Sequence, residues 1–229
     1  MPDVRVIEAL KQTLEKIPDV VYVDKIQVKD NIIQYIVIKS ERVGTITVEQ
    51  LEEKSAKALY NFYFFGLAER SRRLFVPYPL FNPPPTSSDD LAQRIADWKK
   101  EDDWSALKMV KSEEIIGFGL LKRFRSEKVT SGIAIRDNFV KMNLGYLLQT
   151  IINEQARLLS IKSYHVKVVS DNIASVRLHE KCGFRTTRVI HDHNYHDMLQ
   201  YLKECDKAAG GEKIIERQII EMVIKLNNE

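Results

Sequence analysis

The most constraining stretch of this 229-residue sequence runs from Ser170 to Phe184, because both ends of a short helix are marked in it. An apolar run ends at Ser170, and Asp171 or Asn172 can cap a helix that begins directly afterwards. Gly183 favours the left-handed conformation that ends many helices, and Phe184 returns the chain to a sheet. The stretch therefore predicts a tight strand–helix–strand unit.

Apolar runs on both sides of this unit predict a sheet. Three consecutive runs before a long helical pattern are typical of an antiparallel meander, and two more runs follow the short helix. The expected strands are 107–110, 114–124, 129–135, 164–169, 184–190 and 195–202, and the expected helices are 144–159 and 172–181. The order β-β-β-α-β-α-β-β implies an α/β (α+β) fold with a mixed, mostly antiparallel sheet and helices on its faces.

Further elements are expected before and after this sheet. Thr47, with Gln50 three residues later, has the spacing of a capping box and predicts a helix over 48–60. Ser87 marks another helix start, directly after the proline-rich loop 81–88. The remaining expected elements are an amphipathic helix at 2–16, a hairpin of the runs 20–28 and 31–38, and an amphipathic C-terminal helix at 212–226.

Charge and apolar patterning exclude several classes of protein. The 35 Lys and Arg residues and 32 Asp and Glu residues leave a net charge of +3, which is too small and too mixed to indicate a nucleic-acid partner. No apolar run approaches the roughly 20 residues that span a bilayer, and the first residues lack the apolar core of a signal peptide. Cys182 and Cys205 form neither a disulfide framework nor a metal-ligand spacing. We therefore expect a cytoplasmic protein with no membrane or nucleic-acid partner.

As a whole, the stretch from Ser170 to Phe184 resembles the second signature of the GNAT superfamily of acyl-CoA N-acyltransferases. The matching residues are Asn172, Ala174, Ser175, His179, Glu180, Lys181, Gly183 and Phe184. The element order from about 45 to 203 is similar to that of the family. The resemblance implies a GNAT-like acyltransferase domain over 41–203. The helix and hairpin of 1–40 and the helix of 204–229 would be extensions, which suggest a homodimer or another partner.

The resemblance also implies a reaction. Acetyl-CoA would be the co-substrate, and a primary amine would attack its thioester directly; the amine could belong to a small molecule, a polyamine, or a protein lysine or N-terminus. His179 stands where family members often carry the Tyr that protonates the CoA sulfur, so it is the candidate catalytic acid. The alternative for His179 is simple packing on the short helix. Glu113, Glu114 and Asp137 are considered as a base, but none can be assigned.

The family's other signature is a loop that binds the acyl-CoA pyrophosphate, expected before the helix 144–159. Its three characteristic positions hold Val140, Asn143 and Gly145, so one glycine remains. Asn reaches positive φ more readily than most residues, and Lys141 supplies charge. The missing glycine favours an alternative function, a catalytically weak acyl-CoA-sensing or interaction domain.

The resemblance places acetyl-CoA in a groove between the strands around 132–135 and 165–169. The residues expected to bind it are Ile133, Ile135, Lys141, Met142, Asn143, Leu144, Gly145, Tyr146, Asn172 and Ser175. The backbone of the two isoleucines would pair with the pantetheine arm like an extra strand, and Asn172 and Ser175 would face the arm from the other side.

Three charged or titratable clusters have two interpretations each. The histidines could line the acceptor site or lie on the surface, and no metal is expected at them: His191, His193 and His196. The acidic cluster suits an amine or polyamine, or is a solvated surface: Asp89, Asp90, Glu101, Asp102 and Asp103. The basic cluster is a solvated hairpin tip or a partner for the CoA 3′-phosphate: Lys122, Arg123, Arg125 and Lys128.

Overall fold

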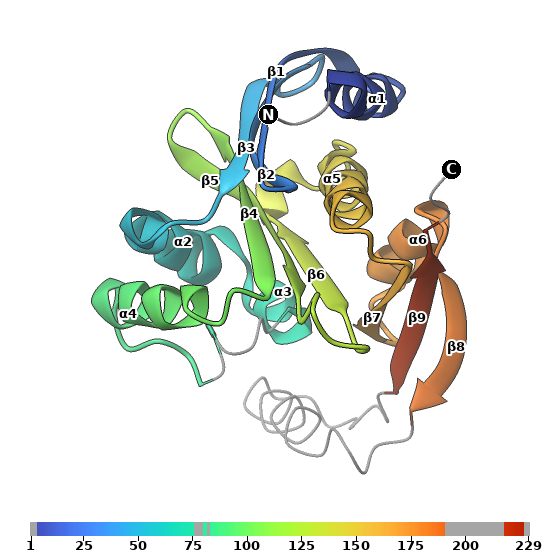
Figure 1. Cartoon of the computed structure of the whole chain (residues 1–229). Helices are drawn as coiled ribbons and strands as arrows, with labels where there is room; N and C mark the ends of the chain where they lie inside the picture. The colour runs from blue at the N-terminus through green and yellow to red at the C-terminus, as the bar shows by residue number, and fades with distance from the viewer. Residues whose placement is uncertain (1–3, 76–79, 82, 191–217, 227–229) are drawn as a thin grey trace.

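The computed structural model, which describes residues 4–75, 80–81, 83–190 and 218–226, is built around one mixed sheet. In these ranges nine strands follow the order β1-β2-β3-β4-β5-β6-β7-β9-β8 (Figure 1). Their bounds are β1 Val20–Lys29, β2 Ile32–Ser40, β3 Gly44–Gln50, β4 Trp104–Lys111, β5 Glu114–Lys122, β6 Thr130–Ile135, β7 Ser163–Val169, β8 Arg185–Ile190 and β9 Ile219–Lys225. Neighbouring strands are antiparallel except β6 and β7, which confirms the predicted mixed, mostly antiparallel sheet.

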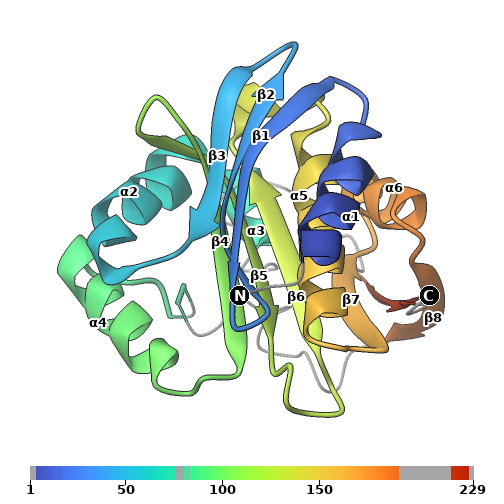
Figure 2. The ribbon, with the colours of Figure 1, turned by 45° about the horizontal axis from the view of Figure 1, so that its top comes forward.

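Helices cover both faces of the sheet. The α-helices are α1 Val4–Glu15, α2 Ala56–Asn61, α3 Glu69–Leu74, α4 Ser88–Lys99, α5 Leu144–Leu158 and α6 Ile173–Lys181. Short turns of other helix types are η1 Glu53–Ser55, η2 Phe62–Gly66 and η3 Asp137–Phe139. α2 and α4 pack together on one face, whereas α1, α5 and α6 belong to the core of the other face (Figures 1 and 2). None of the helices in the described ranges has the length and apolar character needed to cross a membrane.

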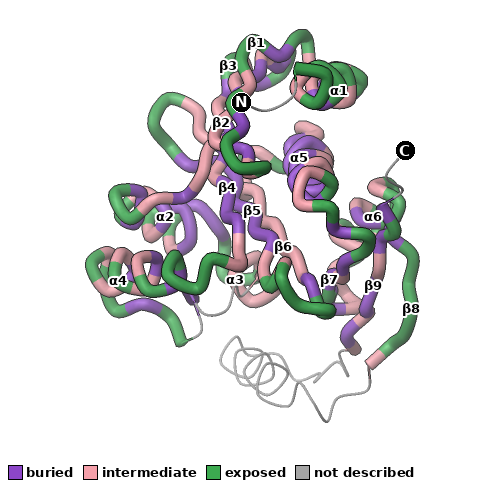
Figure 3. Tube along the Cα trace, in the orientation of Figure 1, coloured by how far each residue is buried: buried purple, intermediate pink, exposed green. Residues whose placement is uncertain are grey.

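The centre of the sheet is buried on both faces. Every residue of β5 from Ile115 to Leu121 is buried, as the continuous apolar pattern of this strand requires (Figure 3). Glycine allows α5 to approach this strand closely, because a Cβ added at Gly119 would lie 2.7 Å from Cδ1 of Ile152. The close packing fixes where the N-terminus of α5 lies relative to β6.

Most predicted elements are confirmed. The amphipathic N-terminal helix, the following hairpin, the meander of three strands and the long helix all occur within a few residues of the predicted bounds. The predicted start of α4 is confirmed as well, because Ser87 Oγ accepts a hydrogen bond from the backbone N–H of Asp90 at 3.1 Å.

The N-terminal hairpin is held to α5 at both ends of that helix. Near its C-terminal end, Oε1 of Gln155 accepts a hydrogen bond of 2.7 Å from the backbone N–H of Ile33. Near its N-terminal end, Nδ2 of Asn143 donates to Oδ2 of Asp19 at 2.5 Å, and Arg42 pairs with the same carboxylate at 3.1 Å. The predicted extension is thus continuous with the sheet and bonded to its central helix, while the domain boundaries at 40 and 203 stay a prediction.

The prediction of a helix over 48–60 is wrong for its first part. Residues Gly44–Gln50 form β3, which pairs with β2 and β4. Gln50 does not complete a capping box; its Nε2 donates to the carbonyl of Ile33 at 2.6 Å and to Oγ of Ser105 at 3.0 Å. Alternate burial along the strand outweighs the capping pattern here.

The expected C-terminal helix over 212–226 is wrong where the structure describes it. Residues Ile219–Lys225 form β9, which lies between β7 and β8 in the sheet. A strand that is covered on both faces has an almost continuous apolar sequence, and Ile-Ile-Glu-Met-Val-Ile fits that pattern as well as it fits a helix. The strand expected at 195–202 lies outside the described residues.

Candidate functional site

The candidate site is a cavity between β6 and β7. These two parallel strands share a single residue pair, Thr130 with His165, and diverge beyond it. A cavity of about 430 Å³ lies there, bounded by β6, the start of α5, β7, α6 and the segment around α3. It occupies the place where the sequence predicts a groove between the strands around 132–135 and 165–169.

Nearly all predicted site residues line this cavity. Those that do are Ile133, Ile135, Lys141, Asn143, Leu144, Gly145, Tyr146, Asn172, Ser175 and His179. Met142 is not among them and packs against the hydrophobic core instead. Sequence reasoning missed the wall formed by Ser71, Leu74 and Phe75, because nothing in the local pattern of that segment shows which part of the sheet it crosses. The roles of the predicted residues toward a cofactor stay predictions.

The loop before α5 keeps its shape without its second glycine. Asn143 has φ 54° and ψ 5°, the left-handed conformation that the sequence predicts to be accessible to Asn. Its side chain does not cap α5 but bonds to Asp19. The first intrahelical hydrogen bond runs from the N–H of Leu147 to the carbonyl of Asn143, so the N–H groups of Leu144, Gly145 and Tyr146 have no partner within the helix.

These N–H groups fit an anionic ligand. The residues that carry them line the cavity, and the helix dipole adds partial positive charge at the same place. Lys181 brings a further cation, because its ammonium lies 4.3 Å from the centroid of the Tyr146 ring. The start of α5 is therefore suited to hold a pyrophosphate.

The start of α6 is arranged differently. Oδ1 of Asn172 accepts a hydrogen bond of 3.2 Å from the backbone N–H of Ser175, which is the predicted cap. One turn later, His179 is only 3% exposed, and its Nδ1 lies 2.7 Å from the carbonyl oxygen of Ser175. Asn172 thus uses its side-chain carbonyl in the helix itself, and α6 holds the His179 ring in one orientation.

The hydrogen bond determines which nitrogen of His179 carries the proton. A carbonyl oxygen only accepts, so Nδ1 is the donor and Nε2 of the neutral ring has a free lone pair. Nε2 is buried and has no hydrogen-bond partner among the residues that the structure describes. Burial lowers the pKa of His179, although the bond to Ser175 acts in the opposite direction. The neutral ring therefore has a lone pair at Nε2 and no proton there to donate, and the predicted acid role stays a prediction.

The carboxylates considered as bases differ in position. Asp137 lines the cavity, but its Oδ1 accepts from Oγ of Ser71 at 2.7 Å and its Oδ2 accepts from the backbone of Ala68. Glu114 pairs with Arg136 at 2.5 Å, and neither it nor Glu113 lines the cavity. Asp137 therefore anchors the α3 segment over the groove.

No metal site is found in the part of the chain that the structure describes, since no group of three or more His, Cys, Asp or Glu side chains is placed to hold an ion. The cluster of His191, His193 and His196 lies outside the described residues.

A sheet split between two parallel strands, with an uncapped helix start beside the split, is suited to bind an extended, anionic ligand. Residues 45–185 match the family model described as "Acetyltransferase (GNAT) domain", and the chain belongs to this family of acetyltransferases. The resemblance noted in the sequence is thereby confirmed. Among curated proteins, none matches this sequence.

Solved structures share the fold. The chain is 16% identical to the GNAT-family acetyltransferase from Streptococcus pneumoniae, with a TM-score of 0.59 over 80% of this chain and 99% of that one. It is 14% identical to spermidine N-acetyltransferase from Vibrio cholerae in complex with CoA and spermine (TM-score 0.58; 79% and 95% covered). A ribosomal L7/L12 alpha-N-protein acetyltransferase in complex with coenzyme A is 13% identical (TM-score 0.61; 80% and 96% covered). At these identities the similarity concerns the fold alone.

Proposed function

We propose that this protein is an acetyl-CoA-dependent N-acetyltransferase in which a primary amine attacks the thioester directly. The observation that carries the proposal is the uncapped start of α5 beside the cavity between β6 and β7. Family membership and the two relatives solved with CoA support the same co-substrate.

In the proposed complex, the two ends of the cofactor use different backbone groups. The pyrophosphate accepts hydrogen bonds from the N–H groups of Leu144, Gly145 and Tyr146. The pantetheine arm lies along β6, where the divergence from β7 leaves the backbone of Ile133 and Ile135 available on that edge. Binding through backbone groups explains why the missing glycine signature does not remove the site.

The proposed chemistry forms one bond and breaks another. The amine nitrogen attacks the thioester carbon, the C–S bond breaks, the amine loses a proton and the thiolate gains one. Most of the acceleration comes from holding amine and thioester together, so no covalent enzyme intermediate is needed. For His179 we propose the acceptor role that its tautomer supports, in which Nε2 takes up a proton that the amine releases.

The alternative of an acyl-CoA-sensing or interaction domain rested on the missing glycine. Because Asn143 adopts the left-handed conformation that a glycine would supply, the missing glycine no longer supports this alternative. No other observation favours that alternative.

Thermal unfolding with and without acetyl-CoA tests the proposal. At about 100 times the dissociation constant, binding stabilises by roughly 2.7 kcal/mol. At about 2–4 °C per kcal/mol, the midpoint should rise by several degrees. Amine-dependent release of thiol should follow in an activity assay. A protein that shows no shift with either acetyl-CoA or CoA has no such site.

A further inference from the structure

The cavity between β6 and β7 is lined from both faces of the sheet. Ile133 and Ile135 pack against the core that includes α5, whereas Ala134 packs against the core on the opposite face. All three line the cavity, although side chains alternate between the two faces along a strand. The cavity therefore passes through the split in the sheet, with the start of α5 on one side and the α3 segment on the other (Figures 1 and 2).

The wall on the α3 side is largely apolar. Leu67, Leu74 and Phe75 line the cavity there. A Cβ added at Gly132 would lie 3.4 Å from Cε2 of Phe75, so this ring covers the backbone of β6 at the glycine. The ring also makes an edge-to-face contact with Phe118, with centroids 6.1 Å apart and planes at 72°. Phe118 thus holds Phe75 in place beside the cavity.

Phe75 lies away from the phosphate end of the groove. A Cβ added at Gly145 would lie 3.8 Å from Cγ1 of Ile135, so the start of α5 adjoins this end of β6. Gly132, which Phe75 covers, is three residue steps, about 10 Å, further back along the strand. In an extended acetyl-CoA the thioester is separated from the pyrophosphate by the pantetheine arm. The reacting carbon would therefore lie on the Phe75 side of Ile135.

Negative charge is scarce along the cavity. Asp137 is the one carboxylate among the described residues that line it. Asp137 follows Ile135 at the phosphate end, and its two oxygens accept hydrogen bonds from Ser71 and from the backbone of Ala68. Its position and its bonds suit the anchoring of α3 rather than contact with an acceptor near Phe75.

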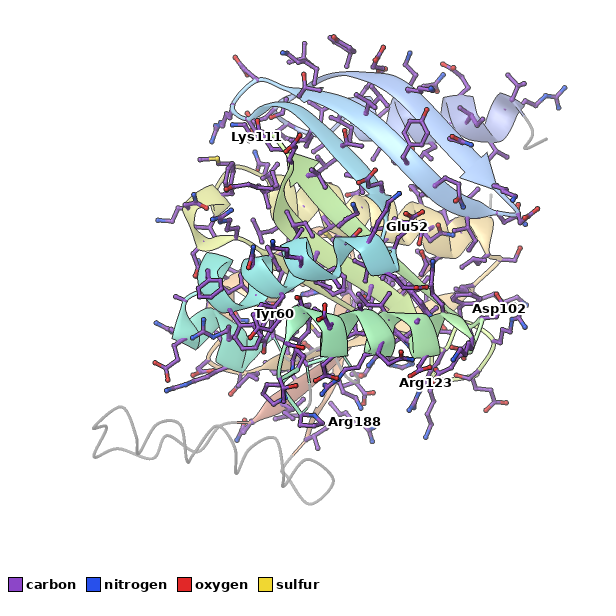
Figure 4. All side chains as sticks on the ribbon, turned by 90° about the vertical axis from the view of Figure 1, so that its left-hand side faces the viewer. Glu52, Tyr60, Asp102, Lys111, Arg123 and Arg188 are labelled. Atoms are coloured by element: carbon purple, nitrogen blue, oxygen red, sulfur yellow. The ribbon has the colours of Figure 1, made fainter. Side chains whose placement is uncertain are left out.

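The acidic cluster that suits a polyamine lies elsewhere. None of its members lines the cavity: Asp89, Asp90, Glu101, Asp102 and Asp103. Asp90 pairs with Arg94 at 3.0 Å. Asp102, at the outer edge of the molecule in Figure 4, pairs with Arg125. The described part of the site therefore does not offer the carboxylates that would hold several ammonium groups.

An apolar wall beside the thioester also suits the chemistry. The amine attacks in its neutral form, and apolar surroundings disfavour the charged ammonium. An apolar group on the acceptor would remove its own surface and that of Leu74 and Phe75 from water. The same contact would hold the amine next to the thioester.

We propose, on the basis of the acetyl transfer proposed above, that the acceptor is a small amine with an aromatic or branched aliphatic group, and that Phe75 selects for this group. The apolar group packs on Leu74 and Phe75, and the amine points into the split between β6 and β7. A polyamine would leave charged groups against the same wall and is a poor acceptor.

Amine binding to the CoA complex tests the proposal without any acetyl transfer. Thermal stabilisation by CoA first shows that the groove is filled in the wild type and in each variant. With CoA in excess, 2-phenylethylamine and, separately, ethanolamine are then titrated calorimetrically. We expect 2-phenylethylamine to bind at least about tenfold more tightly, and Phe75→Ala to lose most of this difference.

Phe64→Ala is the matched control for Phe75→Ala. Phe64 is another half-buried ring that packs against the same core, but it does not line the cavity. It should keep the preference for 2-phenylethylamine. Equal losses in the two variants, or no preference in the wild type, overturn the proposal.

A set of acceptors then tests the substrate class by turnover. We expect kcat/KM to be at least about tenfold higher for 2-phenylethylamine and 3-methylbutylamine than for ethanolamine or spermidine. Leu74→Glu places a carboxylate on the same wall and should shift the preference toward spermidine by about tenfold. This half-buried position keeps the proposal testable if Phe75→Ala does not fold.

The outcomes separate the acceptor class from the acetyl transfer itself. A wild type that binds CoA but favours ethanolamine or spermidine contradicts the apolar acceptor and leaves the proposed function intact. A wild type that binds neither CoA nor acetyl-CoA contradicts the proposed function, and this proposal with it. If CoA binds but no amine of the set reacts, the titration decides.

Discussion

The two helices that begin at the cofactor cavity start in opposite ways. α6 satisfies its own N-terminus, because Asn172 accepts a hydrogen bond from the backbone of Ser175. α5 starts from the left-handed Asn143, whose side chain is bonded to Asp19 and leaves the helix uncapped. A capped start gives fixed positions to side chains such as His179, whereas an uncapped start offers its N–H groups to a ligand. Within one site, the N-terminus of α6 thus positions a side chain, whereas the N-terminus of α5 is available to bind a ligand.

The largest expected effect concerns the side chain that α6 positions. His179→Gln should lower kcat about 100-fold, the lower end of what a proton-transfer group contributes, and leave acetyl-CoA affinity within about threefold. Steady-state kinetics and a separate binding measurement check this split. An unchanged kcat would show that His179 only packs on α6.

The pH dependence sharpens the role of His179. Its pKa is lowered by burial, so the unfolded chain binds this proton more readily than the folded one. The stability that the neutral ring contributes is complete above the ordinary pKa of 6.5 and is lost as the pH falls below it. As the pH falls below 6.5, the stability and the kcat of the wild type should both decrease. His179→Gln lacks the titrating ring and should not show this decrease. For an acid, kcat would instead fall as the pH rises.

The next effect concerns the open end of α5. Asn143→Asp replaces the donor to Asp19 with a second carboxylate beside the expected pyrophosphate. The affinity for acetyl-CoA should therefore fall by at least about tenfold. Isothermal titration measures the loss. Asn138→Asp is the control, because it introduces the same charge at an exposed residue of the preceding turn that does not line the cavity. Equal losses would mean that only overall charge matters.

A smaller effect is expected at the capped end. Asn172→Ala removes the α6 cap, which should cost about 1 kcal/mol. The unfolding midpoint should fall by about 2–4 °C. Ser87→Ala, which removes the cap of α4 far from the cavity, should cause a similar fall. Scanning calorimetry compares the two, and a negligible change at Asn172 alone would show that α6 does not depend on its cap.

The smallest effect is expected for Asn143→Gly. Because Asn143 already has the left-handed conformation, glycine should change acetyl-CoA affinity by less than about threefold. A large gain in affinity would show that the Asn side chain obstructs the pyrophosphate.

The sequence predicts the parts of the site that lie close together in the chain. The α6 unit is marked by Asn172 and Gly183, and Asn143 could be expected to have positive φ from its residue type alone. The tautomer of His179 could not be predicted, because it depends on a carbonyl group whose distance only the folded helix fixes.

Long-range placement is what the sequence leaves open. The apolar spacing of Ile219–Lys225 fits a helix and a buried strand equally well, and only the vacant position between β7 and β8 decides between them. A cavity at the end of β6 and β7 where the two strands still pair is lined by Arg123, Lys167 and Arg188, which belong to three separate segments. No local pattern can show that these cations converge.

The bond between Asn143 and Asp19 makes the cofactor loop and the N-terminal hairpin thermodynamically linked parts. A ligand that orders the loop also stabilises the hairpin, and ordering of the hairpin strengthens ligand binding by the same coupling free energy, since such coupling is reciprocal. Occupancy of the pyrophosphate loop should therefore be detectable far from any ligand, as slower amide hydrogen exchange in α1 and β1. The N-terminal segment would then act as a built-in reporter of the cofactor's presence.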